Sequence, residues 1–145
     1  METKLTRIAQ IAKERPEARI TSLAGLINKE SLTESHRKMS GKKAVGVDQL
    51  TKADYDKNLD DNIESLLVRM KKQAYKPQPV KWVYIPKAGS DKMRPLGIPA
   101  YEDKLVQGVL RDILNAVFEG DFLDCSFGFR PNRGCHDALK AVNEI

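Results

Sequence analysis

Two short segments rich in aromatic and β-branched residues constrain the fold of this 145-residue chain most strongly. Residues 80–86 and 93–99 have the composition of strands, and the polar residues 87–92 between them include a glycine and predict a turn. Pro95 has no amide proton, so the second strand must lie at an edge or leave that position unpaired. The pattern predicts an antiparallel β-hairpin with a basic tip.

Apolar residues at helical spacing occur on both sides of this hairpin. Residues 5–12 predict a first helix that Pro16 ends, and residues 23–27 predict a second, short helix. Residues 40–48 are basic and contain two glycines, which predicts a flexible loop.

Two capping-box patterns predict where the next helices begin. Residues 31–34 have the form Ser-x-x-Glu and open a helix to about Met39, while residues 51–54 open a longer helix that reaches Ala74. Farther along, residues 105–118 give the clearest helical periodicity.

A compact loop is expected at residues 127–134, followed by a last helix over residues 138–145. That helix has no cap in the sequence, which predicts that the chain is cut from a longer protein. The expected fold class is α+β, mostly helical.

Charge is distributed unevenly along the chain. Lys and Arg number 25 against 20 acidic residues, a net charge of +5. Residues 1–100 hold 20 basic and 12 acidic residues, whereas residues 101–145 hold 5 and 8. A basic first part suits an anionic partner, above all nucleic acid, although a solvated basic surface without a partner gives the same count.

The sequence contains no convincing catalytic or metal-ligand constellation. Cys125, Cys135 and His136 lack the paired spacing of a zinc site, and His36 is distant in sequence, so buried thiols and a helix-start imidazole are expected instead. Two cysteines cannot build a disulfide framework, and no apolar run is long enough to span a membrane. These features favour the cytoplasm and predict no membrane association.

Four cations surround the predicted hairpin: Lys81, Lys87, Lys92 and Arg94. Alternate strand residues share a face, so Lys92 and Arg94 should project to one side and help to grip phosphates. The alternative is a charged strand edge that discourages aggregation between sheets.

Three blocks of sequence resemble the reverse transcriptases encoded by group II introns. Residues 76–89 (KPQPVKWVYIPKAG) with residues 93–99 (MRPLGIP) resemble the first reverse-transcriptase block of that family. Residues 126–139 (SFGFRPNRGCHDAL) resemble the second block, and residues 44–48 (AVGVD) resemble the block-zero loop. The blocks occur in the family's order.

The resemblance implies an RNA-directed DNA polymerase that is also a maturase for its intron RNA. Residues 1–50 would be a helical, RNA-binding N-terminal extension with the block-zero loop. Residues 51–145 would be the fingers subdomain of a right-hand polymerase, cut before the palm. Other bacterial reverse transcriptases share enough of the pattern to remain an alternative source of these fingers.

The resemblance also assigns roles to individual residues. Lys87 and Arg94 match positions that contact the triphosphate of the incoming nucleotide, while Pro86, Leu96 and Ile98 would form an apolar floor against the templating base pair. The residues expected to contact template or intron RNA are Lys81, Lys92, Pro86, Leu96, Ile98, Lys42, Lys43, Arg130, Lys4, Arg7, Lys13 and Arg15.

The expected partners are intron RNA, template–primer RNA/DNA and deoxynucleotide triphosphates. Two Mg²⁺ ions serve the complete enzyme, but their carboxylate ligands lie on palm strands, so no catalytic residue, no metal ligand and no polymerase activity are expected within these 145 residues. Two other functions fit the same residues: a non-catalytic RNA-binding module, and an interaction protein that pairs with a second copy of itself.

Overall fold

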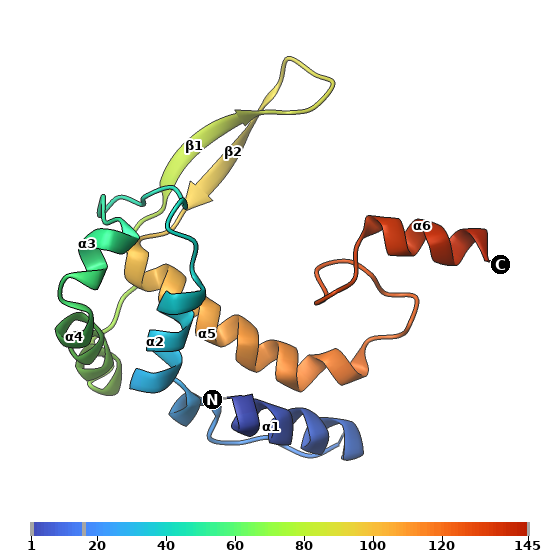
Figure 1. The fold of residues 1–145 in the computed structure, drawn as a ribbon, viewed down its shortest axis with the longest axis horizontal. Helices are drawn as coiled ribbons and strands as arrows, with labels where there is room; N and C mark the ends of the chain where they lie inside the picture. The colour runs from blue at the N-terminus through green and yellow to red at the C-terminus, as the bar shows by residue number, and fades with distance from the viewer. Residues whose placement is uncertain (1, 16, 145) are drawn as a thin grey trace. The chain divides into compact units, whose positions relative to one another are not determined.

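The computed structural model describes residues 2–15 and 17–144. The chain forms two compact units, one of Met1–Leu26 with Arg111–Ile145 and one of Ile27–Leu110. Figure 1 shows the elements in chain order. The functional boundary at residue 50 stays a prediction, because these units are defined by packing alone.

The unit Ile27–Leu110 contains helices, a hairpin and the first part of a long helix. In chain order its elements are α2 (Lys29–Lys38), α3 (Lys52–Asp56), α4 (Leu59–Lys71), β1 (Lys81–Pro86), β2 (Met93–Ile98) and the start of α5 (Tyr101–Phe118). α2 and α3 both contact α4. The mostly helical α+β fold with one antiparallel hairpin is therefore confirmed.

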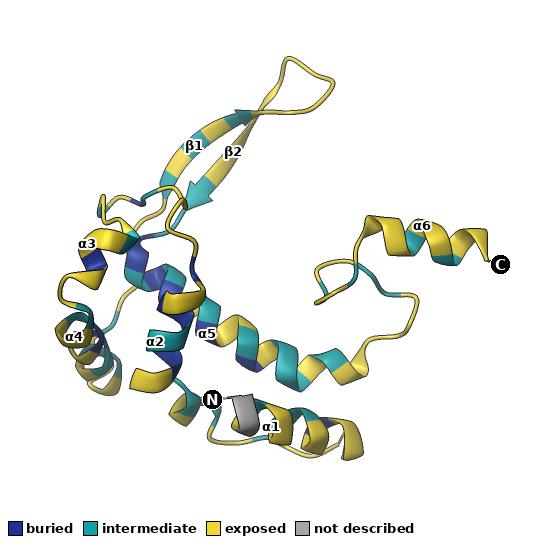
Figure 2. Ribbon diagram, viewed as in Figure 1, coloured by how far each residue is buried: buried dark blue, intermediate teal, exposed yellow. Residues whose placement is uncertain are grey.

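The core of this unit lies among its helices. The fully buried side chains include Leu32 of α2, Ile63 and Leu66 of α4, and Leu105 and Val109 of α5. Figure 2 shows the buried positions gathered on the helices, while most of the hairpin is exposed. The helices thus form the packed base from which the hairpin projects.

A buried polar cluster lies within this core. The His36 ring is 2% exposed, with Nδ1 3.0 Å from the Tyr101 hydroxyl and Nε2 3.2 Å from Asp56 Oδ1. The Tyr55 and Tyr101 rings pack with centroids 4.7 Å apart. Burial, together with the Asp56 charge, raises the pKa of Tyr101 to about 12.

The other unit contains α1 (Glu2–Glu14), the 3₁₀ turn η1 (Leu23–Leu26), the end of α5, the 3₁₀ turn η2 (Glu119–Asp121) and α6 (Cys135–Asn143). α1 contacts η2. Helical spacing predicted α1 correctly. The short helix expected at residues 23–27 forms as a 3₁₀ turn, and Ile145 of the last predicted helix lies outside the described residues.

The capping box predicted at residues 31–34 is wrong. α2 begins earlier, at Lys29, and its cap is Asn28, whose side chain accepts from the Ser31 amide at 3.0 Å. The Ser31 hydroxyl accepts from the Asn28 amide at 2.9 Å, so Ser31 is the last residue of a box that Asn28 opens. Asn28 offers an equally good acceptor one turn upstream, which moves the start of the helix.

The long helix predicted from residue 51 to residue 74 is also wrong in part. Thr51 caps α3 as expected and accepts from the Asp54 amide, but α3 ends at Asp56. The Asn62 side-chain amide donates to the Tyr55 carbonyl at 3.1 Å, which takes up a carbonyl that a continuous helix would use. α4 then runs only to Lys71.

In the described part of the chain, no helix combines the length and apolar character needed to cross a membrane.

Candidate nucleic-acid interface

The strand register brings the four hairpin cations onto one face. β1 pairs antiparallel with β2 so that Ile85 lies opposite Arg94. The Lys87 amide donates to the Lys92 carbonyl at 2.9 Å, which extends this ladder by one pair. Because alternate residues of a strand share a face, Lys81, Lys87, Lys92 and Arg94 lie on the same side. We call this side the cationic face.

The four side chains of the cationic face are accessible. Lys87, Lys92 and Arg94 are exposed, and Lys81 is half-buried. Within the described part of the chain, none of the four has a carboxylate oxygen within 4.0 Å. Their charges are therefore not neutralised by the protein's own carboxylates.

The same alternation separates the apolar residues predicted to form one floor. Leu96 and Ile98 share the cationic face, whereas Pro86 lies on the opposite face with Trp82 and Tyr84. The structure therefore brings two of the three together. Trp82 and Tyr84 are 61% and 62% exposed, so the opposite face is open and aromatic.

The first turn of α5 fixes the loop of residues 40–48 next to the hairpin. The Tyr101 amide donates to Asp48 Oδ2 at 2.6 Å, so Asp48 satisfies a free amide at the start of the helix from 53 residues away. The Lys104 ammonium donates to the Ala44 carbonyl at 2.6 Å. Burial lowers the pKa of Lys104, while the Asp48 charge opposes that shift.

Lys42 and Lys43 lie in the exposed part of this loop. The Lys43 amide donates to the Ser40 carbonyl at 3.4 Å, and the Lys42 amide donates to the Ser40 hydroxyl at 3.3 Å. These contacts use the backbone. Two lysine side chains are thus presented to solvent on a loop whose far end is held by α5.

The same turn of α5 also anchors the base of the hairpin. Asp103 is 4% exposed; its carboxylate accepts from the Gln78 amide at 2.9 Å and from the Tyr75 hydroxyl. Glu102, which precedes Asp103 in the same turn, forms an ion pair with α4: Arg69 NH2 donates to both Glu102 oxygens, at 2.8 and 2.7 Å. The segment that leads into β1 is therefore tied to α5.

The N-terminal cations do not form one cluster. Lys4 and Arg7 line a pocket with residues 18–23 and Leu26, and Arg15 lines a different pocket. Lys13 lies beside Gly120. Of the four cations predicted to bind intron RNA, the structure brings only Lys4 and Arg7 together.

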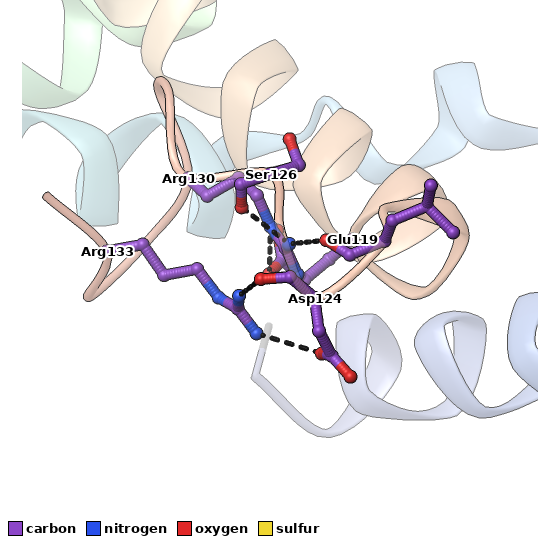
Figure 3. A network of polar contacts seen from close by, with 6 residues as sticks. Glu119, Asp124, Ser126, Arg130 and Arg133 are labelled. Atoms are coloured by element: carbon purple, nitrogen blue, oxygen red, sulfur yellow. Dashed lines mark hydrogen bonds and ion pairs between the residues drawn. The ribbon is translucent and has the colours of Figure 1, made fainter. Parts of the chain in front are cut away.

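The Arg130 side chain forms hydrogen bonds within the protein's own loop. Its Nε and NH2 donate to Glu119 Oε1 at 3.0 and 2.8 Å, and its NH1 donates to the carbonyls of Leu123 and Ser126, both at 2.9 Å. The side chain is only 6% exposed. Figure 3 shows this network, with Arg133 bound to Asp124 beside it. Arg130 thus shapes the loop over residues 119–130.

The cysteines are exposed, which corrects the expectation of buried thiols. Cys135 and His136 begin α6, and both face solvent. Among residues 2–15 and 17–144, no group of three or more His, Cys, Asp or Glu side chains has the arrangement of a metal site.

Sequence reasoning missed the residues that hold the interface together, namely Tyr101, Glu102, Asp103 and Lys104. The acidic pair Glu102–Asp103 was visible as favourable charge in a first helical turn. That signal predicts a helix start, and it says nothing about partners that are 25 to 60 residues away.

Comparison with known proteins gives the family. No protein-family model matches the chain. The group II intron-encoded protein LtrA of Lactococcus lactis subsp. cremoris is 48% identical over 83 residues, 57% of this chain and 14% of LtrA. Protein YkfC of Escherichia coli (strain K12) is 36% identical over 140 residues, 94% of this chain and 36% of YkfC.

The chain belongs to the group II intron-encoded protein family. An uncharacterized 91 kDa protein in the cob intron of Schizosaccharomyces pombe (strain 972) is also 32% identical over 117 residues, 81% of this chain and 14% of that protein. The resemblance to group II intron-encoded reverse transcriptases and maturases is thereby confirmed over part of the chain. The chain spans between 14% and 36% of the length of these relatives.

Proposed function

We propose that this chain is the fingers and RNA-binding part of a group II intron reverse transcriptase and maturase. In this proposal the cationic face of the hairpin binds the template backbone and the triphosphate of the incoming nucleotide. The loop of residues 40–48 lies along the template, and the first helix contributes to intron RNA binding. Magnesium-binding carboxylates outside these 145 residues supply the chemistry of nucleotidyl transfer.

One observation carries the proposal: four cations without carboxylate partners among the described residues share one face with four aliphatic side chains, Val83, Ile85, Leu96 and Ile98. Lys87 and Lys92 are opposed next to the turn, so their side chains start from neighbouring positions on one face, and Arg94 adds a planar fork of donors that suits phosphate oxygens. A polyphosphate chain has the opposite charge and the length to use several of these groups. We therefore assign the triphosphate to Lys87 and Arg94.

The apolar part of the cationic face suits a base pair of any sequence. Leu96 is 48% exposed and Ile98 is half-buried, and neither offers a hydrogen bond that would discriminate between bases. A polymerase that copies every template needs contacts of this kind beside its phosphate contacts. Pro86 lies on the other face, so the proposed floor is limited to Leu96 and Ile98.

Salt-dependent RNA binding by the 145-residue chain tests this proposal. Each contact to a single-stranded phosphate contributes about 0.7 to the slope of log K against log salt concentration. The double variant Lys81→Ala/Lys92→Ala should reduce the slope for an unstructured RNA by about 1.4. The matched control Lys71→Ala/Lys72→Ala removes two exposed charges beyond the hairpin and should change the slope much less. Equal slope changes in the two variants would refute a specific phosphate grip on the cationic face.

A further inference from the structure

A pocket beside α1 has the composition of a nucleotide site. It has a volume of about 430 Å³, which is within the range of about 300–1,000 Å³ typical of small-ligand sites. Figure 1 shows the chain turning back after α1 and running along this helix, and residues from both segments line the pocket. Its floor is aliphatic and consists of Ile8, Ile11, Ile20, Leu23 and Leu26.

Cations surround this floor, and no carboxylate lines it among the residues whose side chains the structure describes. Lys4 and Arg7 are three residues apart and therefore lie on one side of α1, while Arg19 comes from the returning segment. Among the described residues, none of the three has a carboxylate oxygen within 4.0 Å. The pocket thus offers an apolar space inside a ring of positive charge.

The wall of the pocket also has a constrained backbone. Ser22 has φ 64°, in the left-handed region that residues other than glycine seldom adopt. Its carbonyl accepts from the Gly25 amide at 3.1 Å, which closes the turn that leads into η1. This turn keeps the hydroxyl-bearing residues Thr21 and Ser22 at the edge of the pocket.

The geometry points to a pocket that receives one unpaired base of a structured RNA, while Lys4, Arg7 and Arg19 bind the flanking phosphates. This inference rests on the proposed RNA-binding function and adds a specific ligand to it. Proteins recognise RNA mainly through unpaired bases that leave the stack, and extruding a base costs least where it has no pairing partner. Within the described part of the chain no aromatic residue lines the pocket, so the base is surrounded by aliphatic side chains and is not stacked.

A bulged RNA hairpin tests the inference with the complete 145-residue chain. The probe carries 2-aminopurine as a single-base bulge, and the control RNA is the same hairpin without the bulge. We expect the wild-type chain to bind the bulged RNA about tenfold more tightly, equivalent to about 1.4 kcal/mol. Its 2-aminopurine fluorescence should rise on binding, because the base leaves the stack and meets no aromatic ring.

Two matched pairs of variants locate the effect. Thr21→Trp fills the exposed edge of the pocket, and Ile11→Asp places a carboxylate at a position that is already 38% exposed. Both should abolish the preference for the bulged RNA and the fluorescence rise. Ala24→Trp and Ala24→Asp make the same changes at an exposed residue that does not line the pocket, and both should retain the preference. Circular dichroism verifies that all four variants are folded.

The outcomes separate this inference from the proposed function. Tight binding of both RNAs with equal affinity would overturn the base pocket and leave RNA binding intact. A preference that survives Thr21→Trp and Ile11→Asp would also overturn it. If neither RNA binds at low salt, the RNA-binding function and the base pocket are both refuted.

Discussion

Gly46, in the loop of residues 40–48, packs closely against the backbone that directly precedes α5. A Cβ atom at this position would overlap the Pro99 carbonyl oxygen and lie 2.8 Å from the Ala100 Cα. The φ of Gly46 is not in the left-handed region, so the penalty for Gly46→Ala comes from this contact alone. Because the opposing atoms are backbone atoms, no side-chain rotation can relieve the overlap.

The magnitude follows from the two ways in which the chain can respond. If the packing is retained, an extra methyl group in a filled space costs about 1–3 kcal/mol. If the loop moves away, the Asp48 carboxylate no longer caps Tyr101, and loss of such a cap costs about 0.5–2 kcal/mol. Both routes predict a loss of about 2 kcal/mol in the free energy of unfolding.

Urea unfolding followed by circular dichroism measures this loss. With a slope of about 2 kcal/mol/M, the midpoint for Gly46→Ala should fall by about 1 M. Hydrogen exchange of the Tyr101 amide should also accelerate if the loop detaches. Gly41→Ala is the control: it lies in the same loop, nothing lies within 4 Å of its added Cβ, and its midpoint should hardly change. Equal midpoints for the two variants would refute the argument that close packing at Gly46 positions the loop.

Other residues give independent predictions. Asp103→Ala removes the buried, charged acceptor of two hydrogen bonds, from the Tyr75 hydroxyl and the Gln78 amide, and should lower the free energy of unfolding by about 1–3 kcal/mol in urea melts; an unchanged midpoint would contradict the anchoring role. Hydrogen bonds from Lys57 and Thr51 lower the pKa of Asp54 from 3.8 to about 2. This carboxylate therefore stabilises the folded chain above about pH 4, and the stabilisation is lost as the pH falls toward 2. Lys57→Ala should raise the Asp54 midpoint toward 4 in an NMR titration, and a midpoint still near 2 would show that the ion pair does not set it. In a complete reverse transcriptase that carries this chain, Lys87→Ala and Arg94→Ala should each raise the KM for nucleotide about tenfold or more, because a hydrogen bond to a charged group contributes about 1.5–3 kcal/mol. Both variants should affect RNA affinity less. Steady-state kinetics with unchanged KM values would remove the triphosphate assignment.

The hairpin could be predicted from sequence because its determinants are local. Strand-forming residues flank a turn that contains Gly89, which has φ 72° in the structure. The period of two then fixes which residues share a face, once the turn sets the register. The sequence alone could place Lys92 and Arg94 on one side, while adding Lys81 and Lys87 required the observed pairing across the strands.

Helix boundaries were harder because neighbouring residues compete for the same role. Asn28 and Ser31 are both good capping residues, and packing of Leu32 in the core favours the earlier start of α2. The break between α3 and α4 is accompanied by a side-chain hydrogen bond from Asn62 to the Tyr55 carbonyl, which helical periodicity does not reveal. The contacts of Asp48 and Lys104 depend on the tertiary fold, so no local pattern predicts them.

The structure also changes how the net charge should be interpreted. A sequence count treats Arg130 and Arg94 as equal contributions to a basic protein, but the Arg130 guanidinium is 6% exposed and bonded to Glu119 and two carbonyls. If the Arg130 guanidinium left these partners to bind RNA, the Glu119 contact and two carbonyl hydrogen bonds would be lost, which has a high free-energy cost. Arg94 is exposed and has no carboxylate within 4.0 Å in the described part of the chain, so binding a phosphate breaks no internal ion pair. Electrostatic attraction for RNA should therefore arise from the hairpin, the loop at Lys42 and Lys43, and the pocket beside α1, and far less from the residues 119–130 loop.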